Sequence, residues 1–157
     1  MIAAIRQNKL YSLLYAVSMG LIFRLCFGVI KNFVWSRAFD SIAFDVSTPK
    51  AKMLAVVLFA NFITDLSSSL IAALLPGFLL FYVMRKSALR YSFPAILVFL
   101  ALNFRLWRFW QAPDIAIGIS ALMGPFLSAL VFLGVVWLFQ KYFLKRMENN
   151  LSGIGRA

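Results

Sequence analysis

The chain has 157 residues, of which 63% are hydrophobic and 13% are charged. Soluble domains are about 45–50% apolar and about 25% charged, and a soluble core of this size could not bury so many large side chains. The formal charge of +11 would suggest nucleic acid in a soluble protein, but here the Lys and Arg residues mostly flank apolar runs. The composition therefore predicts a membrane protein that contacts anionic lipid headgroups, with no nucleic-acid partner.

The chain contains no His and a single Cys, at position 26. This composition excludes a Ser-His-Asp or Cys-His catalytic unit and the binding of haem or zinc through His. It also excludes an intrachain disulfide. We therefore expect no enzymatic activity, no metal and no cofactor.

Four apolar runs, taken in chain order, predict transmembrane helices at about 10–30, 50–84, 91–110 and 115–140. The first has 21 residues and would be about 31 Å long, close to the thickness of a hydrocarbon core. The second and fourth runs are longer and each contains a proline, so we expect them to be kinked or broken; splitting both gives up to six spans. The fold class is therefore an all-α integral membrane protein, a polytopic helix bundle.

We expect one membrane domain over residues 1–147, followed by a mobile polar tail over 148–157. Within the domain, residues 32–46 are less apolar, and Trp35 and Phe39 share one face with two later apolar positions. This pattern predicts an amphipathic helix lying in the membrane interface. A second interfacial anchor is expected from Arg105, Trp107, Arg108 and Trp110.

Two charged residues interrupt the apolar runs, Arg24 in the first and Asp65 in the second. An unpaired carboxylate in hydrocarbon is costly, so Asp65 must be protonated, paired or wet. Arg24 is its candidate partner if the first two helices are antiparallel neighbours, although Arg24 can instead snorkel to an interface. A structural ion pair and an ion or proton site both remain open. The neighbouring polar residues of this candidate site are Asn61, Thr64, Ser67 and Ser68.

Small residues at Ser120, Gly124 and Ser128 repeat every four positions in the last run. Such a face lets another helix approach closely. The pattern predicts tight helix packing and is weaker evidence for dimerisation.

The charge distribution over four spans places nine basic residues on the side of both termini and six on the other side. The positive-inside rule then puts both termini in the cytoplasm, in a membrane compatible with the bacterial inner membrane. Two functions follow. The favoured one is a non-catalytic accessory or structural subunit of a larger membrane complex, which packs against a partner subunit or a second copy. The alternative is a small oligomeric transporter, channel or lipid-handling protein with Arg24 and Asp65 in its polar pathway.

Overall fold

The computed structural model describes residues 2–40, 50–104, 110–111 and 115–154. All regular structure in these ranges is helical. The elements are α1 (Ile2–Gln7), α2 (Lys9–Asp40), α3 (Lys50–Met84), the short 3-10 helix η1 (Arg85–Ser87), α4 (Ala88–Asn103) and α6 (Ile115–Ile154).

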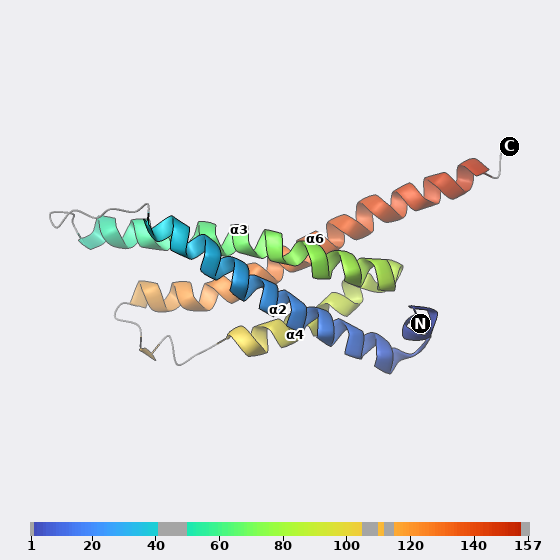
Figure 1. The fold of residues 1–157 in the computed structure, drawn as a ribbon, viewed down its shortest axis with the longest axis horizontal. Helices are drawn as coiled ribbons and strands as arrows, with labels where there is room; N and C mark the ends of the chain where they lie inside the picture. Colours follow the sequence, from blue (N-terminus) through green and yellow to red (C-terminus); the bar gives the residue numbers. More distant parts are fainter. Residues whose placement is uncertain (1, 41–49, 105–109, 112–114, 155–157) are drawn as a thin grey trace.

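Four long helices, α2, α3, α4 and α6, run alternately in opposite directions (Figure 1). α3 packs against α2 and α6, and α4 packs against the same two helices. The order around the bundle axis is therefore α2, α3, α6, α4, with α2 and α6 facing each other across the axis. The N-terminus and the α3–α4 turn lie at one end of the bundle (Figure 1).

Basic residues gather at that end, which we call the basic end. Its members are Arg6, Lys9, Arg85, Lys86, Arg90, Lys141 and Lys145. Arg6 of α1 closes the C-terminal turn of α3, because its Nη2 donates to the Tyr82 carbonyl at 3.1 Å and its Nε donates to the Val83 carbonyl. A cation at this position satisfies helix carbonyls that have no partner within the helix.

Three helical stretches are long and apolar enough to cross a membrane: Lys9–Ser36, Lys52–Asn103 and Gly118–Lys145. The middle stretch contains both α3 and α4, because η1 reverses the chain at Arg85, whose φ is 48°. α4 alone has 16 residues and is about 24 Å long. The all-helical architecture expected from hydropathy is thus confirmed, with three stretches of spanning length.

α2 differs from its expected bounds. It continues without a break from Lys9 to Asp40, so residues 32–40 extend the first helix and no separate interfacial helix begins at residue 32. The reason is that residues 31–40 contain neither Pro nor Gly to end the helix. Residues 41–46 lie outside the described ranges.

The two proline-containing runs each form a single helix. α3 runs through Pro76 and α6 through Pro125, so neither run is split as the six-span alternative required. α6 also continues to Ile154, and the mobility expected for residues 148–157 stays a prediction. α4 ends at Asn103, and Phe104 is extended, so this helix is shorter than the expected 91–110.

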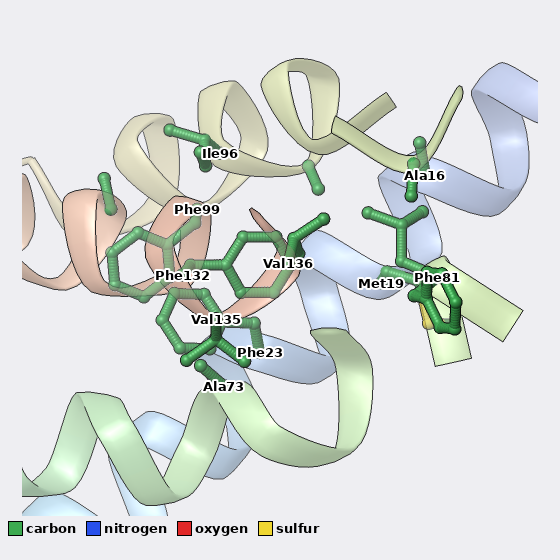
Figure 2. Close-up of a cluster of buried hydrophobic side chains, with 14 of the residues drawn as sticks. Ala16, Met19, Phe23, Ala73, Phe81, Ile96, Phe99, Phe132, Val135 and Val136 are labelled. Carbon is green, nitrogen blue, oxygen red and sulfur yellow. The ribbon is translucent and has the colours of Figure 1, made fainter. Parts of the chain in front are cut away.

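An aromatic cluster fills the centre of the bundle (Figure 2). Phe23 of α2 lies between Phe99 of α4 and Phe132 of α6, with ring centroids 4.4 and 4.8 Å away. All three side chains are buried. The same cluster joins α2 to α6 across the axis, and its dense van der Waals packing stabilises the bundle.

Gly20 sets the spacing between α2 and α4. A Cβ at this position would collide with the backbone carbonyl of Ala95. Glycine is therefore required here for close helix approach, which brings the aromatic cluster together.

Candidate functional site

A cavity of about 710 Å³ lies among α2, α3, α4 and α6. Its lining residues come from the later part of α2 and the early part of α6, in the half of the bundle away from the basic end. We call it the polar cavity. Its polar lining residues are Arg24, Lys31, Asn32, Asn61, Asp65, Asn103 and Ser120. Four helices thus contribute side chains to one space that holds two cations, one carboxylate and three amides.

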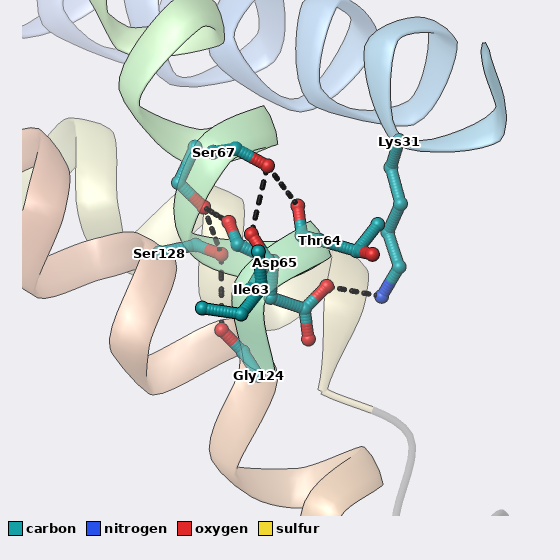
Figure 3. A network of polar contacts seen from close by, with 8 residues as sticks. Lys31, Ile63, Thr64, Asp65, Ser67, Gly124 and Ser128 are labelled. Carbon is teal, nitrogen blue, oxygen red and sulfur yellow. Dashed lines mark hydrogen bonds and ion pairs between the residues drawn. The ribbon is translucent and has the colours of Figure 1, made fainter. Parts of the chain in front are cut away.

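Asp65 is the most buried charge in this cavity. Its Oδ1 lies 2.5 Å from the Lys31 Nζ, and the two side chains are 7% and 36% exposed. Figure 3 shows Lys31 reaching from α2 toward the Asp65 carboxylate on α3. Because Lys31 keeps part of its surface accessible, only the carboxylate bears a large desolvation cost, which the ammonium offsets.

The partner of Asp65 differs from the expected one, since Lys31 and not Arg24 makes the ion pair. The two cations are seven residues apart, which is almost two full turns, so they share one face of α2. The two helices α2 and α3 are antiparallel neighbours, as expected. The axial register between them, however, brings Lys31 to Asp65 in place of Arg24. A seven-residue shift moves the position by about 10 Å.

Arg24 faces the polar cavity and has no partner among the residues that the structure describes. Its side chain is partly buried, and no hydrogen bond or ion pair joins its guanidinium to the described residues. Phe27 and Gly28, on the next turn of α2, line the same space. A partly buried guanidinium with five unused donors is an unusual arrangement, because desolvated charges are ordinarily paired.

Gly124 of α6 gives the Asp65 carboxylate its space. A Cβ at position 124 would collide with the Asp65 Oδ2. Four residues on, the Ser128 Oγ lies 2.7 Å from the Ser69 Oγ of α3 and 2.9 Å from the Gly124 carbonyl (Figure 3). The small-residue face predicted on α6 therefore packs against α3 of the same chain.

The remaining predicted polar residues occupy different surroundings. Asn61 and Ser120 line the polar cavity, while Thr64 and Ser68 are buried. Ser67 donates to the carbonyl of Ile63 at 2.7 Å in its own helix, so its hydroxyl does not contribute to the cavity.

The residues predicted as interfacial anchors also lie in different surroundings. Trp35 lines the polar cavity, and Trp110 is 81% exposed. The side chain of Phe39, with Arg105, Trp107 and Arg108, lies outside the described residues.

Four residues of this region were not singled out from the sequence as site residues. They are Lys31, Asn32, Ser69 and Asn103. For Lys31 a usable signal was present, namely its seven-residue spacing from Arg24. Asn103 carried none, because its place in the cavity depends on how α4 packs against α2.

Metal-binding residues do not gather in the described ranges, where no group of three or more His, Cys, Asp or Glu side chains is found. The polar cavity instead offers the Arg24 guanidinium, side-chain amides and an ion pair. This set can bind and orient a charged group. No protein-family model, curated protein or solved structure matches the chain.

Proposed function

We propose that this chain is an integral membrane protein that binds and moves a solute or lipid carrying an anionic group, with Arg24 and Asp65 in its polar pathway. The observation that carries the proposal is the Arg24 guanidinium on the wall of the polar cavity, which is unpaired within the described part of the chain. Arginine presents planar donors that match a carboxylate or phosphate.

The charge balance of the cavity supports an anionic ligand. Lys31 neutralises Asp65, so the lining retains one net positive charge, at Arg24. The amides of Asn61 and Asn103 line the same space and can donate further hydrogen bonds to ligand oxygens. A cationic ligand would have to approach two cations and would find the one carboxylate already paired.

The position of the cavity along α3 also supports access from one membrane face. Asp65 precedes Arg85 by 20 residues, which is about 30 Å along a helix and close to the thickness of a hydrocarbon core. If the basic end marks one interface, the polar cavity lies toward the other. The positive-inside rule makes the basic end cytoplasmic, so the cavity faces the opposite compartment.

The test uses a reporter thiol in the cavity. Gly28 lines the cavity and a Cβ there would meet no atom within 4 Å, so Gly28→Cys is tolerated, in a Cys26→Ser background. We expect an anionic methanethiosulfonate to react at least about tenfold faster than a cationic one of equal size, because the unpaired cation raises the local anion concentration. Arg24→Gln should remove this preference.

Gly134→Cys provides the matched control, since a Cβ there also meets no atom within 4 Å but position 134 does not line the polar cavity. It should show no dependence on Arg24. Equal rates for the two reagents at position 28, or a preference that survives Arg24→Gln, would contradict the proposed anion pathway.

A second candidate function, an accessory subunit of a larger membrane complex, is favoured by the shape of α6. This helix has 40 residues, about 60 Å, and its C-terminal part projects beyond the bundle (Figure 1). Tyr142 on this part is 64% exposed. A stoichiometric partner that co-purifies from native membranes and is lost on Tyr142→Ser would support this function, whereas a partner retained by Tyr142→Ser would count against α6 as the contact.

A further inference from the structure

The polar cavity has an apolar opening along α2. Two residues that line the cavity, Leu25 and Val29, are 59% and 72% exposed. Ala121 of α6 also lines the cavity and is exposed. A residue that lines a cavity and is also exposed lies at the mouth of that cavity. The polar cavity therefore opens toward the outside of the bundle along α2, and α6 contributes to the same mouth.

This mouth lies partly at the depth of the acyl chains, if the basic end is taken as one membrane interface. Leu25 follows Lys9 of the basic end by 16 residues, about 24 Å along α2, within a hydrocarbon core about 30 Å thick. Asn32, which also lines the cavity and is exposed, follows Lys9 by 23 residues, about 34 Å along the helix. The mouth is thus apolar at the depth of the acyl chains and polar at the depth of the headgroups.

An apolar stripe joins this mouth to the middle of the membrane. Leu21, Leu25 and Val29 recur every four residues on α2 and are all exposed, so they form one stripe on the helix surface. Arg24 stands beside this stripe, lines the cavity, and has no hydrogen-bond or ion-pair partner within the described ranges. A guanidinium matches a phosphate, and an exposed aliphatic stripe matches an acyl chain. Both features belong to one kind of molecule, an anionic lipid.

We propose that the ligand of the polar cavity is an anionic phospholipid that enters sideways from the bilayer. Its phosphate contacts Arg24, and an acyl chain lies along Leu21, Leu25 and Val29. This inference rests on the function proposed above and narrows its ligand to a lipid. Arg24 follows Lys9 by 15 residues, which places it about 8 Å inside the far edge of the hydrocarbon core. A lipid reaches that depth with its chain still in hydrocarbon, whereas a soluble anion has no part that the stripe would contact.

Protection of a thiol in the cavity tests the proposal. Gly28→Cys, in a Cys26→Ser background and in phosphatidylcholine vesicles, is treated with N-ethylmaleimide, which is uncharged and does not respond to surface charge. Phosphatidic acid added to the vesicles should slow the reaction at least about fivefold, because an occupied cavity shields the thiol in proportion to ligand binding. Diacylglycerol, which lacks the phosphate, and glycerol 3-phosphate, which lacks the chains, should each change the rate by less than about twofold. Arg24→Gln should abolish the protection.

A matched pair of leucine variants tests the sideways route. Leu25→Asn should raise the fraction of phosphatidic acid needed for half-protection at least about threefold, because a polar side chain at the mouth removes an acyl-chain contact. Leu130→Asn on α6 is the control, since Leu130 is 65% exposed but does not line the polar cavity, and it should leave that fraction unchanged. Equal shifts in the two variants would overturn the sideways route.

The ligand itself has separate contradicting results. Protection by diacylglycerol equal to that by phosphatidic acid, or protection that survives Arg24→Gln, would overturn the phosphate contact. Protection by glycerol 3-phosphate without protection by phosphatidic acid would overturn the lipid ligand. That last result would leave the anion pathway standing, because the pathway is measured independently by the Arg24-dependent preference of Gly28→Cys for the anionic methanethiosulfonate. Loss of that preference as well would overturn both proposals.

Discussion

The two ends of the bundle hold hollows of similar size, but one surrounds a buried charge and the other is lined by exposed charged residues. The polar cavity, of about 710 Å³, surrounds the Asp65 carboxylate. This side chain is 7% exposed and forms an ion pair with Lys31 of α2. The hollow at the basic end, of about 610 Å³ between α4 and α6, is lined by the exposed residues Lys141 and Lys145 together with Leu89, Trp137 and Leu144. A buried charge has to be satisfied by the protein itself, whereas an exposed charge can be satisfied by a headgroup or by solvent. Substitutions at the two ends should therefore differ mainly in their effect on stability.

Lys31→Ala should have the largest effect, since it leaves the Asp65 carboxylate buried without its counter-ion. We expect a loss of about 2–4 kcal/mol in the free energy of unfolding, somewhat below the range for a fully buried pair because Lys31 is partly exposed. Unfolding in mixed micelles measures it. Lys145→Ala, at the basic end, should change the free energy of unfolding by less than about 0.5 kcal/mol. Equal losses at the two positions would remove the distinction between the ends.

Gly124→Ala should come next, because the added Cβ collides with the Asp65 carboxylate. Overpacking of this kind costs about 1–3 kcal/mol. Gly134→Ala, in the same helix and with no atom within 4 Å of the new Cβ, should be neutral or stabilising by up to about 1 kcal/mol. Thermal melts of the two variants under one condition give the comparison. A Gly124→Ala protein as stable as Gly134→Ala would contradict the placement of Asp65.

Gln140→Ala tests the connection at the basic end. It removes two hydrogen bonds, to the Lys86 carbonyl and from the Leu89 N–H, and should cost about 1–2 kcal/mol. Amide hydrogen exchange at Leu89 should speed up in the variant, because that N–H loses its acceptor. Gln7→Ala, at an exposed position on α1, serves as the control. Unchanged exchange at Leu89 would show that Gln140 does not hold the turn.

Ser128→Ala should have the smallest effect. The Ser69 hydroxyl loses its contact with Ser128 but keeps the Asp65 carbonyl of its own helix as an acceptor. Hydrogen bonds between membrane helices contribute about 0.6 kcal/mol on average, so a loss near that value is expected. Ser18→Ala, whose hydroxyl bonds only within α2, should change stability less. A loss above about 2 kcal/mol at Ser128 would mean that the serine pair organises the α3–α6 contact.

Hydropathy was sufficient to predict the helices and their alternation, but it was weaker at their ends. The bounds of α3, Lys50–Met84, match the predicted run because charged residues flank it on both sides. α2 was predicted to end near Ile30 because Lys31 looked like a membrane exit. The structure instead places Lys31 inside the bundle, paired with Asp65, so the helix continues.

The candidate site could be predicted in its composition but not in its pairing. Periodicity places Arg24 and Lys31 on one face of α2 and Asn61 and Asp65 on one face of α3. Which of these meet depends on the axial register of the two helices, and that register is decided by contacts between them, such as the hydrogen bond that the Tyr15 hydroxyl donates to the Leu79 carbonyl at 3.1 Å. No local pattern in one sequence carries this information.

The proposed separation of the two ends by the membrane is tested most directly by labelling with a membrane-impermeant thiol reagent. Gly28→Cys and Lys145→Cys, each in a Cys26→Ser background, report the polar cavity and the basic end. In intact cells Gly28→Cys should react from outside, while Lys145→Cys should react only after the membrane is permeabilised. Reaction of both positions from the same side would contradict the placement of the two sites at opposite membrane faces.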